Sequence, residues 1–179
     1  MIILAGPIGS GKSEQGQRLA KRLGCPWISS GQLLREQANK KNQAVMETGS
    51  LVNDDYIISL LDEKFNEIDA AHKEFILDGT PRTLAQAQWL ISKINSRELK
   101  FTAIIMLKVS KKIVLKRLVG RGRKDDDLKV IDERLKEYKT NTIKAIKYLR
   151  MEGLRLDEVD GEKTPQQVEK TIVELLNLS

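Results

Sequence analysis

The chain reads GPIGSGKS from Gly6 to Ser13, between a short apolar run and a long amphipathic stretch. The pattern is a glycine, four residues and then Gly-Lys-Ser, and it stands where a strand would turn into a helix. Its glycines let backbone N–H groups point into the turn, where the helix dipole adds positive charge. We expect Lys12 to reach the β and γ phosphates of a nucleotide and Ser13 to offer its hydroxyl to Mg²⁺. A plain glycine-rich turn is the alternative, which the strand–loop–helix order disfavours.

On either side of this motif, short apolar runs alternate with longer amphipathic stretches. The apolar runs predict strands at residues 2–5, 27–28, 75–77, 102–108 and 155–159. The amphipathic stretches predict helices at residues 13–23, 54–68, 84–94, 111–119, 128–151 and 164–178. Buried strands separated by helices indicate a parallel sheet covered on both faces. We therefore expect a three-layer α/β/α architecture in a single domain, residues 1–179.

The composition is that of a folded, water-soluble protein, with 40% hydrophobic and 31% charged residues in 179. Cys25 is the single cysteine, so neither an internal disulfide nor a cysteine zinc site can form. The apolar start lacks the basic flank of a signal peptide. No apolar run approaches the roughly 20 residues that a membrane helix needs. These features predict a cytoplasmic location and no membrane partner.

The net charge of +6 is unevenly distributed along the chain. Residues 108–124 contain eight Lys or Arg and no acid. Such a block is commonly a solvated face, but it can also attract a polyanion. Nucleic acid is an unlikely partner in our interpretation, because an aromatic content of 4% leaves little material for stacking bases.

Four further segments follow in an order that resembles the adenylate kinase family. They are ISSGQLLRE (28–36), METGSLVND (46–54), ILDGTPRTLAQ (76–86) and KRLVGRGRKDDD with the IDERL that follows it (116–135). A last piece, VDGEKTP (159–165), is similar to the family's adenine-binding loop. The resemblance covers the whole chain and implies a P-loop kinase fold. It implies a central parallel five-stranded sheet, a small helical monophosphate-binding insert at about residues 30–59, and a lid.

The lid is where the chain differs from long-lid relatives, which carry an insertion between two arginines. Here only Gly122 separates Arg121 from Arg123, so the resemblance implies a short lid loop at about residues 120–127. Asp125 and Asp126 match an acidic pair that can hold the lid arginines when the lid closes. Capping of the next helix is the alternative reading of this acidic run.

The resemblance also implies roles for individual side chains. A guanidinium group stays charged and binds phosphate oxygens in pairs, which suits transfer between two polyanions. The implied catalytic residues are Lys12, Arg82, Arg121, Arg123 and Arg134. The implied ATP contacts are Gly9, Ser10, Gly11, Lys12, Ser13, Arg117, Arg121, Gly161 and Lys163. The implied monophosphate contacts are Ser30, Arg35, Met46, Val52, Gly79, Arg82 and Gln86.

Mg²⁺ is the one cofactor that the sequence predicts. Asp78 ends an apolar strand beside the phosphate loop, where a carboxylate can orient Mg²⁺ and its waters. We expect it to form the metal site together with Ser13, partly through water, and a plain turn aspartate before Gly79 is the alternative. Gln32 stands where the family commonly has an aspartate that holds a water on the metal, which alters the expected metal affinity.

The base of the acceptor is open at this point. By resemblance Gln86 contacts it, and a glutamine amide matches adenine in one orientation and guanine when flipped. Cytosine presents the same edge pattern as adenine on a smaller ring. Ser30, Ser50 and Thr80 replace a common threonine, lysine and phenylalanine, and each can shift base choice. We favour AMP over CMP or UMP.

The predicted activity is a reversible, Mg²⁺-dependent reaction of ATP and AMP that yields two ADP, carried out by a monomer. A UMP/CMP kinase of the same family is the first alternative. A nucleotide-dependent nucleic-acid-binding protein is a second, which would show steep salt dependence and negligible phosphotransfer. A P-loop kinase for another small acceptor, such as shikimate, is disfavoured by the segments at residues 30–35 and 78–86.

Overall fold

The computed structural model describes residues 1–37, 40–119 and 127–178, which form a five-stranded parallel sheet with helices on both sides. The strands run in the order β2-β3-β1-β4-β5. They are β1 (Ile2–Ala5), β2 (Trp27–Ser29), β3 (Ile76–Asp78), β4 (Ala103–Lys108) and β5 (Leu156–Asp160). The five predicted strands are confirmed, and no end differs by more than one residue.

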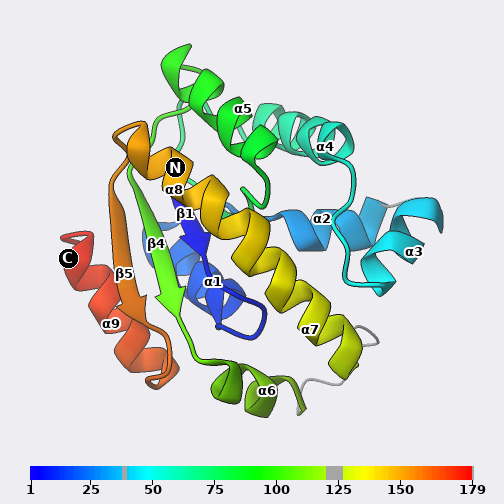
Figure 1. Ribbon diagram of the computed structural model, residues 1–179. Coiled ribbons are helices and arrows are strands. Elements are labelled where there is room, and N and C mark those ends of the chain that lie inside the picture. The colour runs from blue at the N-terminus through cyan, green and yellow to red at the C-terminus, as the bar shows by residue number, and fades with distance from the viewer. Residues whose placement is uncertain (38–39, 120–126, 179) are drawn as a thin grey trace.

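The helices of the described residues cover both faces of this sheet (Figure 1). They are α1 (Lys12–Leu23), α2 (Ser30–Gln37), α3 (Lys40–Glu47), α4 (Asp54–Glu67), α5 (Leu84–Asn95), α6 (Lys111–Val119), α7 (Leu128–Glu137), α8 (Ile143–Met151) and α9 (Pro165–Leu175). Helices α1 and α9 lie on one face, and α4, α5 and α8 lie on the other. The three-layer α/β/α prediction is therefore confirmed.

The central strand β1 shows why the sheet has two cores. Successive side chains of a strand point to opposite faces. Ile3 belongs to the cluster that includes Leu90 and Leu149 of α5 and α8, whereas Ile2 and Leu4 belong to the cluster with α1 and α9. Because β1 is buried on both faces and lies in the middle of the sheet, the loop that follows it opens at the centre of the sheet's carboxyl edge.

The insert predicted at about residues 30–59 contains α2, α3 and the start of α4. Our helix prediction identified α4 but assigned no separate helices to residues 30–47. Asn53 caps α4, because its side-chain oxygen accepts from the backbone N–H of Asp55 and Tyr56. This cap fixes where the chain turns from the insert back towards the core.

The predicted single helix at residues 128–151 is wrong in one respect. A π-helical turn, Tyr138–Thr142, separates α7 from α8. Such turns insert an extra residue into a helix and are frequent at functional sites. Tyr138 and Thr142 of this turn line the wall of the main cavity.

The predicted short lid at residues 120–127 lies outside the described residues, except for Asp127. The side chain of Asp127 accepts from the backbone N–H of Lys129 at 2.8 Å and caps α7. Helix capping therefore accounts for this last residue of the acidic run. Within the described ranges, none of the helices has the length and apolar character that spanning a bilayer requires.

Close packing of α1 on the sheet gives a prediction about stability. A Cβ atom at Gly16 would lie 2.6 Å from Trp27 Nε1 and 3.1 Å from Leu4 Cδ1. We expect Gly16→Ala to lower the free energy of unfolding by roughly 1–3 kcal/mol through overpacking, although alanine favours a helix by about 1 kcal/mol. Urea unfolding measures the change, with the exposed neighbour variant Gln17→Ala as control. A Gly16→Ala protein as stable as the parent would contradict this packing.

Candidate functional site

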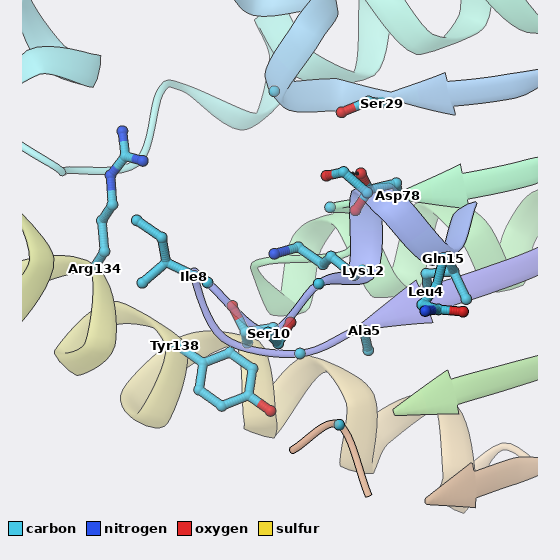
Figure 2. Close-up of a pocket in the computed structure, with 18 of the residues that line it drawn as sticks. Leu4, Ala5, Ile8, Ser10, Lys12, Gln15, Ser29, Asp78, Arg134 and Tyr138 are labelled. Atoms are coloured by element: carbon cyan, nitrogen blue, oxygen red, sulfur yellow. Dashed lines mark hydrogen bonds between the residues drawn. The ribbon is translucent and has the colours of Figure 1, made fainter. Parts of the chain in front are cut away.

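A cavity of about 510 Å³ opens at the carboxyl edge of the sheet (Figure 2). Its walls come from the loop after β1, the first turn of α1, the ends of β2 and β3, and residues of α7 and the π-helical turn. Ligands of open α/β folds bind at this edge, where the loops converge. The geometry therefore brings segments distant in sequence to one concave site.

The phosphate loop forms one wall of the cavity. Gly9 and Gly11 have φ angles of 71° and 90°, a region that side chains other than glycine rarely adopt. This backbone turns sharply into α1, which begins at Lys12. The Lys12 ammonium donates to Pro7 O at 3.2 Å and its side chain extends across the mouth of the loop (Figure 2). The predicted loop residues Gly9, Ser10, Gly11, Lys12 and Ser13 all line the cavity.

An acidic corner lies beside the loop. The Ser13 hydroxyl donates to Asp78 Oδ2 at 2.6 Å, so the two predicted metal residues are adjacent. Asp78 is 1% exposed, and its other oxygen, Oδ1, has no hydrogen-bond partner among the described residues. A buried carboxylate oxygen without a partner is unfavourable unless a cation or ordered water satisfies it. An oxygen pair of this kind fits Mg²⁺ and its waters.

Three arginines contribute to the wall of the cavity. Arg35 from α2, Arg82 from the loop after β3, and Arg134 from α7 all line the cavity. A Cβ atom at Gly31 would lie 3.5 Å from Arg35 Nη1 and 3.6 Å from Arg82 Nη2, so these two guanidinium groups flank one glycine. Three cations that converge on one space define an anion site.

The charge on Arg82 is held in an unfavourable environment. Burial lowers its pKa, repulsion from Arg134 and Arg35 lowers it further, and only Asp78 opposes this. Its Nε donates to Gly79 O at 2.8 Å, which fixes the guanidinium at the cavity wall. A clustered, desolvated cation of this kind is stabilised when an anion binds beside it.

The predicted ATP-binding residues after the phosphate loop lie at one end of the cavity. Arg117 makes long contacts at 3.4–3.5 Å with Gly9 O and Ser10 O, and at 3.4 Å with Glu162 O. It therefore connects the phosphate loop to the loop after β5, where Gly161 and Lys163 line the cavity. Gln15 connects α1 to the start of α9, because its Nε2 donates to Pro165 O at 2.9 Å.

The predicted base-binding residues are placed differently from the phosphate-binding ones. Arg35, Gly79 and Arg82 line the cavity, whereas Ser30, Met46, Val52 and Gln86 do not. Val52 and Gln86 are buried, and Met46 packs against the main hydrophobic core. A base would have to displace neighbouring side chains to reach them. Arg121 and Arg123 lie outside the described residues.

Sequence reasoning missed some residues of the cavity wall, chiefly Ser29 and Tyr138. Ser29 ends β2 directly beside Asp78 in the register of β2 and β3, a position that strand ends alone could have suggested. Burial raises the pKa of Tyr138 to about 12, with a further contribution from Glu158, so its phenol stays neutral. Tyr138 faces the phosphate loop in Figure 2, and no sequence pattern signalled the π-helical turn that begins at this residue.

The arrangement identifies the class of protein. A phosphate loop alone serves many nucleotide-binding proteins, but three arginines that line the same cavity as the loop suit the transfer of a phosphoryl group between two bound anions. The fold and the site together are those of a P-loop phosphotransferase.

Comparison with known sequences gives the family. A sequence model of adenylate kinases matches residues 4–154. An adenylate kinase of Chelativorans sp. (strain BNC1) is 37% identical, and the match covers 98% of this chain and 97% of that protein. One from Azorhizobium caulinodans is 36% identical over the same shares, and one from Mycobacterium leprae is 37% identical over 88% of this chain and 90% of that protein. The chain belongs to the adenylate kinase family, and it is a nucleoside monophosphate kinase.

Proposed function

We propose that the protein catalyses the reversible transfer of the terminal phosphoryl group of ATP to AMP, with Mg²⁺, to give two ADP. The observation that carries this proposal is that Lys12 of the glycine loop and Arg82 of the loop after β3 line the same cavity. A donor triphosphate on the glycine loop and an acceptor phosphate on Arg35 and Arg82 would meet between them, end to end.

The chemistry needs charge neutralisation and alignment more than a general base, because the acceptor is already an ionised phosphate. In our proposal Lys12, Arg82 and Arg134 act on the group in transit, and Arg121 and Arg123 join them from the lid. Arg134 Nη2 also donates to Met46 O at 3.3 Å, so it connects α7 to the monophosphate insert. Closing the insert and positioning Arg134 would therefore occur together.

Ser13 and Asp78 are the residues that would hold Mg²⁺, directly or through water. When bound with ATP, the ion supplies positive charge next to the β and γ phosphates. Support comes from the buried, unpartnered Oδ1 of Asp78 and from the bond between Ser13 and Asp78 Oδ2. The carboxylate is thus already oriented by the serine hydroxyl before metal arrives.

AMP remains our preferred acceptor, with CMP and UMP as alternatives, and Gln86 remains the proposed base contact. We propose small nucleotides and not nucleic acid as partners, because Arg117 of the basic block contacts the phosphate loop within the cavity. Action as a monomer in the cytoplasm is part of the same proposal.

An ADP-formation assay tests the function directly. The purified protein with ATP is given AMP, CMP, UMP, GMP or a deoxy form, each with Mg²⁺ or with a chelator. We expect fast ADP formation with AMP, slower formation with the pyrimidine monophosphates, and none without metal. ATP consumption that ignores the monophosphate, or none at all, would reject the proposal. Faster turnover of CMP or UMP than of AMP would replace it by the pyrimidine alternative.

A further inference from the structure

The side-chain amide of Gln86 is bonded at both ends. The backbone N–H of Arg82 donates to Gln86 Oε1 at 2.8 Å, and Gln86 Nε2 donates to Asp54 Oδ1 at 2.8 Å. Gln86 is 2% exposed, so water does not compete freely for either bond. The amide is therefore held by one donor and one acceptor that belong to different parts of the fold, the loop after β3 and the start of α4.

These two partners permit only one orientation of the amide. A half-turn of the amide would set its NH₂ against the N–H of Arg82, and its oxygen against the carboxylate of Asp54. Both contacts would change from attractive to repulsive, in a buried place where unsatisfied polar groups are strongly unfavourable. An ionised carboxylate can accept hydrogen bonds but cannot donate one, so Asp54 cannot adapt to the flipped amide.

Asp54 is itself held in place. The same Oδ1 accepts a second bond at 2.8 Å from the hydroxyl of Thr83, which caps α5 by accepting from the backbone N–H of Gln86. Asp54 also lies in the first turn of α4, directly after the capping residue Asn53, where the helix dipole favours a carboxylate. The position of the Asp54 carboxylate is thus fixed by α4, on which it lies, and by Thr83 at the start of α5.

A primary amide in this arrangement keeps one hydrogen on nitrogen and one lone pair on oxygen for a ligand. Adenine offers an amino donor beside a ring-nitrogen acceptor, and guanine offers a carbonyl acceptor beside a ring N–H donor. The orientation held by Asp54 settles which end of Gln86 is the acceptor. We propose that Asp54 is a specificity-determining residue that selects adenine over guanine by fixing the amide of Gln86. This inference rests on the proposed function, because it takes Gln86 as the base contact.

The test compares the binding of AMP and GMP by titration calorimetry, which needs no turnover. In D54N the new side chain can present either an acceptor or a donor to Gln86, so one of the two restraints on the amide is lost and only the N–H of Arg82 still opposes the flipped orientation. We expect the ratio of AMP to GMP affinity to fall by about five- to tenfold. The control D55N removes an exposed carboxylate in the same helical turn without a bond to Gln86, and its ratio should stay within about twofold of the parent.

A double-mutant comparison separates the specific role from a structural one. If Asp54 acts through Gln86, then adding D54N to Gln86→Ala leaves the AMP to GMP ratio of Gln86→Ala unchanged. Equal weakening of AMP and GMP in D54N, or an added effect in the Gln86→Ala background, would overturn the inference. Should D54N fail to fold by circular dichroism, Asp54→Ser takes its place, because serine also suits a helix start.

The outcomes for the inference and for the proposed function can be told apart. A parent protein that prefers AMP in calorimetry but forms no ADP contradicts the proposed function and leaves the binding ratio as the test of Asp54. A parent protein that binds AMP and GMP equally contradicts the role of Asp54, whether or not ADP is formed.

Discussion

Replacing Lys12 with alanine is expected to slow phosphoryl transfer by about 100- to 1,000-fold. The ammonium lies at the mouth of the glycine loop, where it would meet the charge that moves between the β and γ phosphates. Loss of an interaction that strengthens in the transition state lowers kcat more than it raises KM. The fold should persist, because the side chain bonds to Pro7 O within its own loop. Steady-state kinetics with varied ATP, and a thermal melt, check both parts.

Lys21→Ala is the matched control for this variant. Lys21 lies on the same helix, is exposed, and carries the same charge away from the cavity. It should leave kcat within about twofold of the parent. A Lys12→Ala protein with near-parent kcat would mean that the loop backbone alone carries the triphosphate, and our assignment of Lys12 would be wrong.

The glycine loop shows how far local sequence can predict structure. GPIGSGKS specifies its own backbone, because its glycines permit the positive φ angles at Gly9 and Gly11. The strand before it and the helix after it follow from hydrophobic periodicity. Such local signals suffice for the sheet, the layers and the phosphate wall of the cavity.

The parts that sequence missed depend on contacts between distant segments. Helices α2 and α3 are eight residues each and largely polar, so their pattern was weak, and they are stabilised by packing of the insert on the core. The turn at Tyr138 breaks a pattern that otherwise continues as one helix. The bond from Gln86 to Asp54 joins residues 32 apart, and no local pattern predicts it.

The predicted base contacts illustrate a different limit. Gln86 and Val52 were inferred to be base contacts from a resemblance. A resemblance predicts which residues match those of the family, but not whether the insert is open or closed. In this structure both are buried, whereas the arginines proposed to bind phosphate lie on the cavity wall. Electrostatic repulsion among the arginines keeps them from packing together, whereas the apolar side chain of Val52 packs into the core and the amide of Gln86 is satisfied by Arg82 N and Asp54 in the absence of a ligand.

Replacing Arg82 with alanine is expected to have the largest effect, a loss of about 1,000-fold or more in kcat/KM for AMP. Arg82 is at the centre of the cation cluster, and its orientation is fixed by the bond from Nε to Gly79 O. Both the KM for the monophosphate and kcat should change, because the acceptor phosphate and the group in transit would lie beside the same guanidinium. The KM for ATP should change little, since the proposed site of the donor is the glycine loop. Arg150→Ala, an exposed arginine of α8 that does not line the cavity, is the control.

The same substitution should leave the stability of the ligand-free protein almost unchanged. Removing Arg82 loses the bond to Gly79 O, a loss of about 1 kcal/mol. Gly79 O nevertheless keeps the hydroxyl of Ser30 as a donor at 3.0 Å. Against that loss, the lowered pKa of Arg82 means that the folded state disfavours this charge, so removing it relieves repulsion from Arg35 and Arg134. Activity and stability should therefore respond very differently to one change.

Thermal melts with and without AMP make this contrast measurable. A ligand that binds only the folded state raises its stability in proportion to the logarithm of ligand concentration over Kd. AMP should raise the melting temperature of the parent protein clearly and that of Arg82→Ala hardly at all, although both melt at similar temperatures when free. If Arg82→Ala melted far below the parent without ligand, Arg82 would be a structural residue whose charge is satisfied within the fold. The anion site would then have to be assigned to Arg35 and Arg134 alone.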